Sequence, residues 1–192
     1  MTSLTIAPLT PDHTEDFITL FGPSGACYGC WCTYFRLPPK LRAEFTAQER
    51  KSVMLRRIAE GPPPGLMGWL DAEPVAWMQI GPRSDVPQWN NPRRATTPLP
   101  DAPADDPAVW AISCFFIRNR TRGLGLSHQM VRAGIDFARE NGARVLEAAP
   151  MDQAKQSKSI GLFVGSTSVF RAAGFSEVAR QKPGRPLMRL VL

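Results

Sequence analysis

The feature that most constrains this fold is the stretch from residue 108 to 142, where a strand, a glycine turn and a helix follow one another. Val109–Ile117 is an apolar run rich in β-branched and aromatic residues, which predicts a buried strand. From Leu126 onward, apolar side chains recur at intervals of three and four, which predicts a helix with one buried stripe. Gly142 stands where a left-handed helix C-cap belongs, so we expect the helix to end there.

The turn at residues 122–127 has the composition of an anion-binding site. Gly123 and Gly125 carry no side chain that would block approach to the backbone. The first N–H groups of a helix have no partner within it, and the helix dipole adds partial positive charge there. Three arginines between residues 118 and 122 strengthen the preference for a phosphate or pyrophosphate. The alternative is a basic turn exposed to solvent.

This turn resembles the acyl-CoA-binding motif of the GNAT superfamily of N-acyltransferases, Arg/Gln-x-x-Gly-x-Gly/Ala. Two registers fit, and the later one departs from the pattern by a serine at its last position. The phase of the helix favours the later register, because Met130 and Val131 then fall where the family places its paired apolar residues. The two registers are Arg120-x-x-Gly123-x-Gly125 and Arg122-x-x-Gly125-x-Ser127.

The resemblance implies an α/β (α+β) fold with a mixed, twisted, mostly antiparallel sheet of about seven strands and helices on both faces. We expect residues 1–192 to form a single GNAT-like domain. The proline-rich segment 82–108 is interpreted either as a long functional loop or as an exposed, partly disordered insertion. Beside the motif unit, we expect strands at 4–9, 66–70, 75–80, 143–149, 175–179 and 187–192, and helices at 10–21, 39–60 and 162–173.

Composition limits the partners. The N-terminus has no secretory signal and no apolar run approaches the ~20 residues that span a bilayer, so we expect a cytoplasmic protein without a membrane partner. The formal charge of +6 could indicate nucleic acid. However, the arginines are spread along the chain without a block of five or six like charges, and the phosphates of CoA explain part of the excess. Nucleic acid is therefore a minor interpretation.

The resemblance implies acetyl-CoA as cosubstrate. The family pattern puts the pantetheine amides along the backbone of the motif strand, where that strand and the next splay apart. It puts the pyrophosphate against backbone N–H groups of the turn. The residues expected to bind acetyl-CoA are therefore Phe115, Phe116, Ile117, Arg122, Gly123, Leu124, Gly125, Leu126 and Ser127.

The reaction would be direct attack of an amine on the thioester, which requires removal of a proton from the amine. Glu147 is the leading base candidate, because it is an acid in an apolar strand beside the expected notch, where burial would raise its pKa. The alternative is that Glu147 faces solvent. Glu73 and the acids at 101–106 are weaker candidates.

The family often protonates the leaving thiolate with a tyrosine four residues before a Gly-Phe turn, and this chain has Phe170 there. Phe170 cannot donate a proton. Either Ser166, Ser168 or water does so, or the protein is not an ordinary catalyst.

Three cysteines between residues 27 and 32 form C-x-x-C-x-C, and Cys114 lies far away in the motif strand. They are compatible with a zinc site, with a redox pair, with thiols that line the acceptor pocket, or with small buried apolar residues. We predict no metal, because a complete four-ligand pattern is missing. In the family, the segment between the first two helices borders the acceptor. The residues expected to bind the acceptor are therefore Cys30, Trp31 and Tyr34.

Together these features predict an N-acetyltransferase that transfers an acetyl group from acetyl-CoA to a primary amine of a small molecule or peptide. One alternative is a non-catalytic acetyl-CoA-binding regulatory module, which Phe170 supports. A further alternative is a basic nucleic-acid-binding protein with a cysteine-bound metal. The expected partner is the amine acceptor, and the sequence allows for a homodimer.

Overall fold

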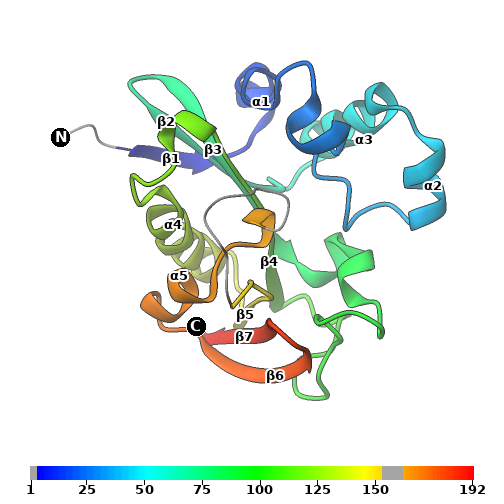
Figure 1. Ribbon diagram of the computed structural model, residues 1–192, viewed down its shortest axis with the longest axis vertical. Helices are drawn as coiled ribbons and strands as arrows, with labels where there is room; N and C mark the ends of the chain where they lie inside the picture. Colours follow the sequence, from blue (N-terminus) through cyan, green and yellow to red (C-terminus); the bar gives the residue numbers. More distant parts are fainter. Residues whose placement is uncertain (1–3, 153–161) are drawn as a thin grey trace.

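The computed structural model describes residues 4–152 and 162–192, in which seven strands form one mixed sheet (Figure 1). The strand order is β1-β2-β3-β4-β5-β7-β6, with β4 and β5 parallel and all other neighbours antiparallel. The predicted mixed, mostly antiparallel sheet is therefore confirmed. The strands are β1 (Leu4–Pro8), β2 (Gly65–Leu70), β3 (Glu73–Pro82), β4 (Val109–Ile117), β5 (Val145–Ala148), β6 (Ser176–Lys182) and β7 (Arg185–Val191).

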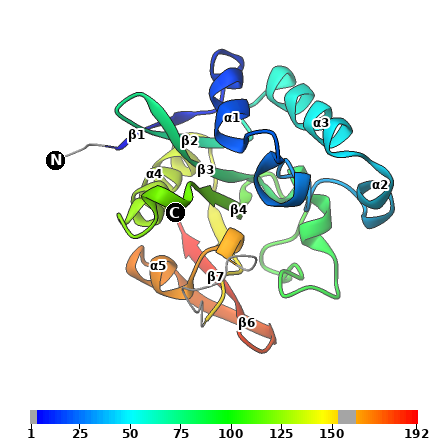
Figure 2. The ribbon, with the colours of Figure 1, turned by 45° about the horizontal axis from the view of Figure 1, so that its top comes forward.

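Helices cover both faces of this sheet (Figure 2). Helices α4 and α5 pack on one face, and α1 and α3 pack on the other face of the N-terminal strands. The α-helices are α1 (Thr14–Phe21), α2 (Pro39–Glu44), α3 (Ala47–Glu60), α4 (Leu126–Glu140) and α5 (Thr167–Ala172). Short 3-10 turns are η1 (Pro11–His13), η3 (Arg83–Asp85), η4 (Pro87–Asn90), η5 (Asn119–Thr121) and η6 (Leu162–Val164). No helix in the described ranges is long and apolar enough to cross a membrane.

Two expected helices are interrupted. The prediction of one helix at 39–60 is wrong, because Phe45 is extended and Thr46 begins α3 with a capping box. The Thr46 hydroxyl accepts from the Glu49 N–H at 3.2 Å, and the Glu49 carboxylate accepts from the Thr46 N–H at 2.7 Å. The prediction of one continuous helix at 162–173 is also wrong. Gly165, with φ +77°, separates η6 from α5.

The motif helix α4 packs its predicted stripe against the sheet. Met130 and Val131 are fully buried, and Gly134 lies against Met78 and Ile80 of β3. A Cβ atom on Gly134 would lie 2.4 Å from Cε of Met78, so a larger residue would force this side chain to move. The prediction of an amphipathic helix from Leu126 is confirmed.

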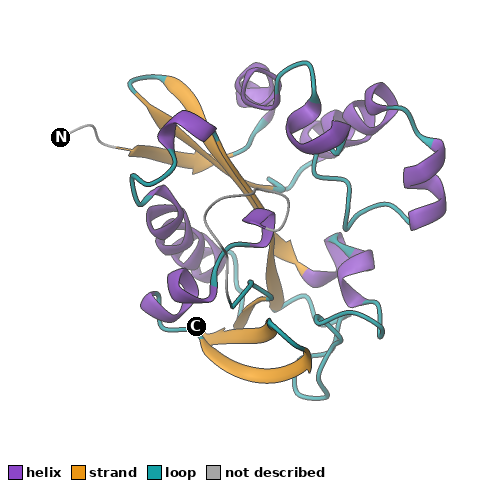
Figure 3. Ribbon diagram, in the orientation of Figure 1, coloured by secondary structure: helices purple, strands orange, loops and turns teal. Residues whose placement is uncertain are grey.

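The segment between β3 and β4 covers the second face of the C-terminal strands (Figure 3). Trp89 is only 1% exposed and packs with Phe35 and Leu187. Asp85 anchors the segment through ion pairs of 2.9 Å with Arg36 and with Arg57. The interpretation as an exposed, partly disordered insertion is therefore wrong, because its aromatic residue forms part of the core.

The site is positioned by the point at which the pairing of β4 with β5 stops, which is before β4 itself ends. The parallel pairing stops at Ile112 with Ala148, while β4 continues to Ile117 paired only with β3. A bulge leaves Ser113 between the residues that pair with Gln79 and Ile80. Beyond this point, the edge of β4 that faces β5 has no paired strand.

We expect Thr46→Ala to lower the free energy of unfolding by about 1 kcal/mol, because it removes the side chain that caps α3. Urea denaturation measures the difference. Ser52→Ala on the exposed face of the same helix is the matched control and should have a smaller effect. Equal effects of the two variants would contradict the capping role.

Candidate functional site

A cavity of about 550 Å³ lies between the free end of β4 and the start of α4, and we call it the turn cavity. Its lining includes eight of the nine residues predicted to bind acetyl-CoA. Leu124 is the exception and points outward, with 60% of its surface exposed. The lining comprises Cys27, Phe115, Phe116, Ile117, Thr121, Arg122, Gly123, Gly125, Leu126, Ser127, His128, Phe163, Gly165, Ser166 and Val169.

The glycine turn is open to a ligand. Gly123 and Gly125 have φ of +84° and +72°, and a Cβ on either would have no atom within 4 Å. Within the described ranges, the five successive N–H groups of residues 123–127 have no backbone acceptor. Arg122 donates from Nε to the Ile117 carbonyl at 3.2 Å, which ties the turn to the strand end. The turn thus presents unpaired donors at a helix N-terminus, an arrangement suited to a phosphate or pyrophosphate.

The basic residues around the turn are not equivalent. Arg118 pairs with Glu73 at 3.1 Å, and Arg120 pairs with the same carboxylate. Both are therefore partly neutralised. Glu73, a weaker base candidate, is held by these two arginines and does not line the turn cavity. Arg122 has no ion-pair partner in the described ranges and is the arginine that lines this cavity.

A second cavity of about 430 Å³, the loop cavity, lies between the segment after α1, the helices α2 and α3, and β4. It shares Cys27, Phe115, Phe116 and Phe163 with the turn cavity, so the two meet at the end of β4. The lining comprises Phe21, Ala26, Cys27, Tyr28, Cys30, Cys32, Tyr34, Pro39, Arg42, Ala43, Arg50, Cys114, Phe115, Phe116 and Phe163.

Two of the three residues predicted to bind the acceptor, Cys30 and Tyr34, line this cavity, whereas Trp31 does not. Trp31 is 3% exposed and stacks on Phe21 with ring centroids 5.5 Å apart. A Cβ on Gly25 would lie 2.3 Å from Nε1 of Trp31, so the chain must fold closely around the indole. The structure therefore gives Trp31 a packing role and corrects its assignment to the acceptor pocket.

All four cysteines of the chain lie at the loop cavity. The Sγ atoms of Cys32 and Cys114 are 3.4 Å apart, and Trp77 donates from Nε1 to Cys32 Sγ at 3.1 Å. Burial raises the pKa of Cys27, and raises that of Cys30 to about 11. The hydrogen bond with Cys32 and burial raise the pKa of Cys114 well above its usual value. These three thiols are therefore protonated at neutral pH.

The cysteines do not converge with other ligands on a common point. In the described ranges, no group of three or more His, Cys, Asp or Glu side chains is arranged to hold a metal ion. Cys32 and Cys114 are packed as small apolar side chains, while Cys27 and Cys30 are more accessible at the cavity wall.

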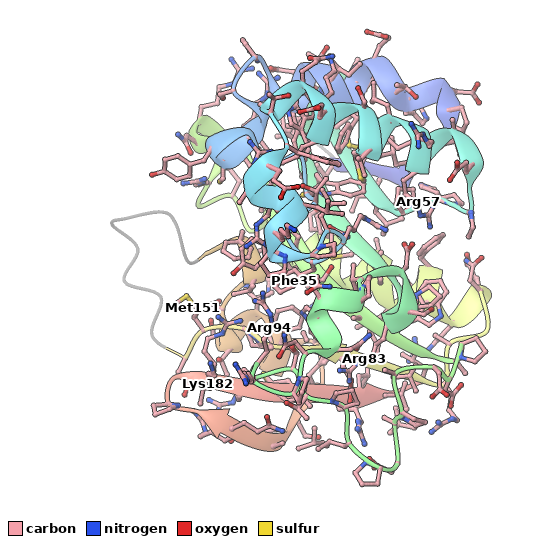
Figure 4. All side chains as sticks on the ribbon, turned by 90° about the vertical axis from the view of Figure 1, so that its right-hand side faces the viewer. Phe35, Arg57, Arg83, Arg94, Met151 and Lys182 are labelled. Carbon is pink, nitrogen blue, oxygen red and sulfur yellow. The ribbon has the colours of Figure 1, made fainter. Side chains whose placement is uncertain are left out.

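Glu147 lies elsewhere. It is fully buried, so the alternative that it faces solvent is wrong, and Arg83 and Arg189 hold its carboxylate. Arg189 donates to Oε1 from Nε at 2.9 Å and from Nη2 at 2.7 Å, and Arg83 donates to Oε2. Figure 4 labels Arg83, which lies at the start of the segment between β3 and β4. Glu147 lines neither cavity, so the geometry gives it a structural role in place of the hypothesised catalytic one.

Phe170 also belongs to the core. It is fully buried, with ring centroids 6.1 Å from Phe115 and 5.2 Å from Phe175. Ser166, one of the hydroxyls considered as proton donors, lines the turn cavity and lies 3.0 Å from the Ser168 hydroxyl. The turn cavity therefore has one of these hydroxyl groups in its wall, whereas Phe170 is not part of its lining.

Sequence reasoning missed Arg42, Arg50 and Phe163, which all line the loop cavity. Nothing in their local pattern distinguishes them from solvent-facing arginines or a core phenylalanine. It also missed Arg94, which donates to the Tyr34 hydroxyl at 3.3 Å. This hydrogen bond lowers the pKa of Tyr34, partly opposed by burial.

Comparison with known proteins agrees with this geometry. A family model described as "Acetyltransferase (GNAT) family" matches residues 30–164, well over half of the chain. No curated protein matches the chain.

Solved structures of N-acetyltransferases share the fold at low sequence identity. PaiA N-acetyltransferase from Thermoplasma acidophilum, in complex with coenzyme A, has a TM-score of 0.57 and 9% identity over 99% of both chains. The ribosomal-protein-alanine N-acetyltransferase from Brucella melitensis has a TM-score of 0.56 and 17% identity over 98% of this chain and 99% of its own. YncA from Salmonella typhimurium, a putative acetyltransferase solved with acetyl-CoA, has a TM-score of 0.56 and 16% identity over 98% of this chain and 94% of its own. The predicted GNAT fold is confirmed.

We expect Glu147→Gln to lower the free energy of unfolding by about 3–5 kcal/mol, because it leaves the buried Arg83 without a carboxylate partner and leaves Arg189 paired only with Asp101. Urea denaturation measures the loss. Glu177→Gln removes an exposed carboxylate paired with Arg180 and is the matched control, which should leave stability nearly unchanged. A similar, small effect of both substitutions would contradict the structural role of Glu147.

Proposed function

Because the chain belongs to the GNAT acetyltransferase family, we propose that it transfers an acetyl group from acetyl-CoA to a primary amine of a small molecule or peptide. The observation that carries the proposal is the meeting of the turn cavity and the loop cavity at the end of β4. One cavity has the features of an anion site, and the other is lined mostly by apolar and aromatic side chains. A donor and an acceptor could therefore approach each other there from opposite sides.

The turn cavity suits acetyl-CoA. The open glycines and the N–H groups of residues 123–127 would hold the pyrophosphate, and Arg122 would add positive charge. The unpaired edge of β4 from Phe115 to Ile117 offers backbone groups to the pantetheine amides. When bound, the thioester supplies an activated acyl group.

The acceptor's amine would attack the thioester carbonyl as the neutral form, forming the amide bond as the carbon–sulfur bond breaks. No Asp or Glu side chain lines either cavity in the described ranges, so a carboxylate base is not at hand. We propose that a water molecule at the shared end of the two cavities accepts the amine proton. The leaving thiolate would take a proton from water or from Ser166, which lines the turn cavity.

The second candidate is an acetyl-CoA-binding module without catalysis, favoured by the absence of a hydroxyl at Phe170. The two functions differ in one measurement. Purified protein is incubated with acetyl-CoA and a panel of primary amines, and release of free CoA is followed with a thiol reagent. Amine-dependent release together with an acetylated product by mass spectrometry supports catalysis. Tight acetyl-CoA binding by calorimetry without release for any amine would support the regulatory module.

We expect Gly125→Glu to weaken acetyl-CoA binding by more than about tenfold, because it adds bulk and a negative charge where the pyrophosphate would lie. Isothermal titration calorimetry measures the affinity. Gly142→Glu is a matched control, because Gly142 also has positive φ and open space around it but lies at the far end of α4. Unchanged affinity in Gly125→Glu, or an equal loss in the control, would refute the proposed cradle.

We expect Phe170→Tyr to change turnover by less than about tenfold if another group already protonates the thiolate. The buried hydroxyl should also lower stability, since Phe170 is enclosed by aromatic side chains. Phe175→Tyr, at the neighbouring buried ring, controls for this loss of stability. A gain in turnover of several hundredfold would indicate that the native chain lacks a proton donor and would favour the regulatory module.

A further inference from the structure

The loop cavity contains two arginines that the proposed reaction does not use. Arg42 lies on α2 and Arg50 on α3, both side chains are half-buried, and both line the cavity. Neither has an ion-pair partner in the described ranges, in contrast to Arg57 on the same helix as Arg50, which pairs with Asp85. Residues 1–3 and 153–161 contain no Asp or Glu. The cavity wall therefore carries positive charge with no carboxylate of the described residues within ion-pair distance, although the neighbouring Glu49 interacts with Arg50 at longer range.

The two side chains are held in place by neutral contacts. Arg42 donates from Nη1 to the Tyr34 carbonyl at 2.9 Å, and its guanidinium carbon lies 4.2 Å from the centre of the Tyr34 ring. Arg50 donates from Nη1 to the Arg42 carbonyl at 3.0 Å, and its Nε is buried without a partner. These contacts fix the guanidinium groups and leave other N–H donors unused. Held donors of this kind lose little freedom when they bind a ligand.

The two arginines line a different part of the loop cavity from the end where the acetyl group would be transferred. Cys27, Phe115 and Phe116 belong to the end shared with the turn cavity, where the acetyl group would be transferred. Arg42 and Arg50 come from α2 and α3 and are absent from the lining of the turn cavity. Most of the remaining lining is apolar or aromatic. An acceptor in this space would have its amine at the shared end, an apolar body, and a group facing the arginines.

We propose that the acceptor is a primary amine that carries a carboxylate, and that Arg42 and Arg50 bind this carboxylate. The inference rests on the proposed acetyl transfer. A planar carboxylate matches the paired N–H donors of a guanidinium, and hydrogen bonds to such a charged pair are stronger than neutral ones. A volume of about 430 Å³ is sufficient for an acceptor of about the size of an amino acid or a short peptide end.

The experiment compares matched amines that differ only in this group. The pairs are 4-aminobutanoate, 6-aminohexanoate and 4-(aminomethyl)benzoate, in which an apolar body separates the amine from the carboxylate, each assayed against the corresponding carboxamide. The value of kcat/KM is measured for each member of a pair. We expect at least one carboxylate to be preferred by ~10–100-fold, the size of a charge-assisted hydrogen bond. Arg42→Gln and Arg50→Gln should each reduce the ratio towards one. Arg42→Lys keeps the positive charge but lacks the planar pair of N–H donors, so it should retain part of the preference for the carboxylate.

Arg56→Gln is the matched control, because Arg56 is exposed on α3 and lines neither cavity. Acetyl-CoA affinity should be the same in all variants. The melting temperature should fall by no more than a few degrees, the size expected for the lost contacts with Tyr34 and the Arg42 carbonyl, which separates loss of the acceptor site from loss of the fold. A wild-type enzyme that acetylates amines but treats carboxylates and carboxamides alike would overturn the inference and leave the proposed function standing.

A second measurement does not need turnover. Binding of N-acetyl-6-aminohexanoate is compared with binding of its carboxamide by calorimetry in the presence of CoA. An arginine-dependent preference for the carboxylate, with no amine acetylated, would support the anion site and overturn the acetyltransferase proposal. Absence of both turnover and preferential binding would overturn both.

Discussion

The site depends on the point at which β4 and β5 separate. Their ladder ends at Ile112 and Ala148, yet β4 continues for five residues paired on one side only. Backbone N–H and C=O groups require hydrogen-bond partners, so the free edge of β4 can accept the amides of a ligand where a neighbouring strand would otherwise lie. The bulge at Ser113 bends the strand at the same place. Both cavities meet at this end, so their position follows from the separation of two strands.

The sequence could predict the turn cavity because its chemistry belongs to the backbone. A buried strand, two glycines and an amphipathic helix are local patterns, and they specify where free N–H groups will lie without knowledge of distant residues. Thr46 and Glu49 are a second case in which a local pattern contains the information. Their spacing is that of a capping box and was sufficient to divide the expected helix at 39–60, although the apolar pattern alone suggested one element.

Glu147 and Trp31 show where local patterns fail. Burial of Glu147 followed from its apolar strand, but its partners are 64 and 42 residues away in the sequence, and these arginines decide its role. Trp31 stands among pocket residues in the sequence, yet its side chain turns into the core against Phe21. Trp31 itself has φ +47°, a left-handed conformation that costs about 1–3 kcal/mol in a non-glycine residue. Burial of the indole can offset that cost, but the surface for it comes from Phe17 and Phe21 on α1, which the residues around Trp31 do not specify.

The electrostatics of the loop cavity follow from its cysteines. Burial raises the pKa of Cys30 to about 11, and the hydrogen bond with Cys32 together with burial holds the pKa of Cys114 well above its usual value. These thiols therefore fill space without adding negative charge. Arg42 and Arg50 are consequently the charges on this wall that persist at neutral pH, and a carboxylate on the acceptor would offset them. At the shared end, an amine would face a neutral thiol and aromatic rings, which give an ammonium ion no counter-charge. Such surroundings favour the neutral amine, the form able to attack a thioester, and this reduces the need for a carboxylate base.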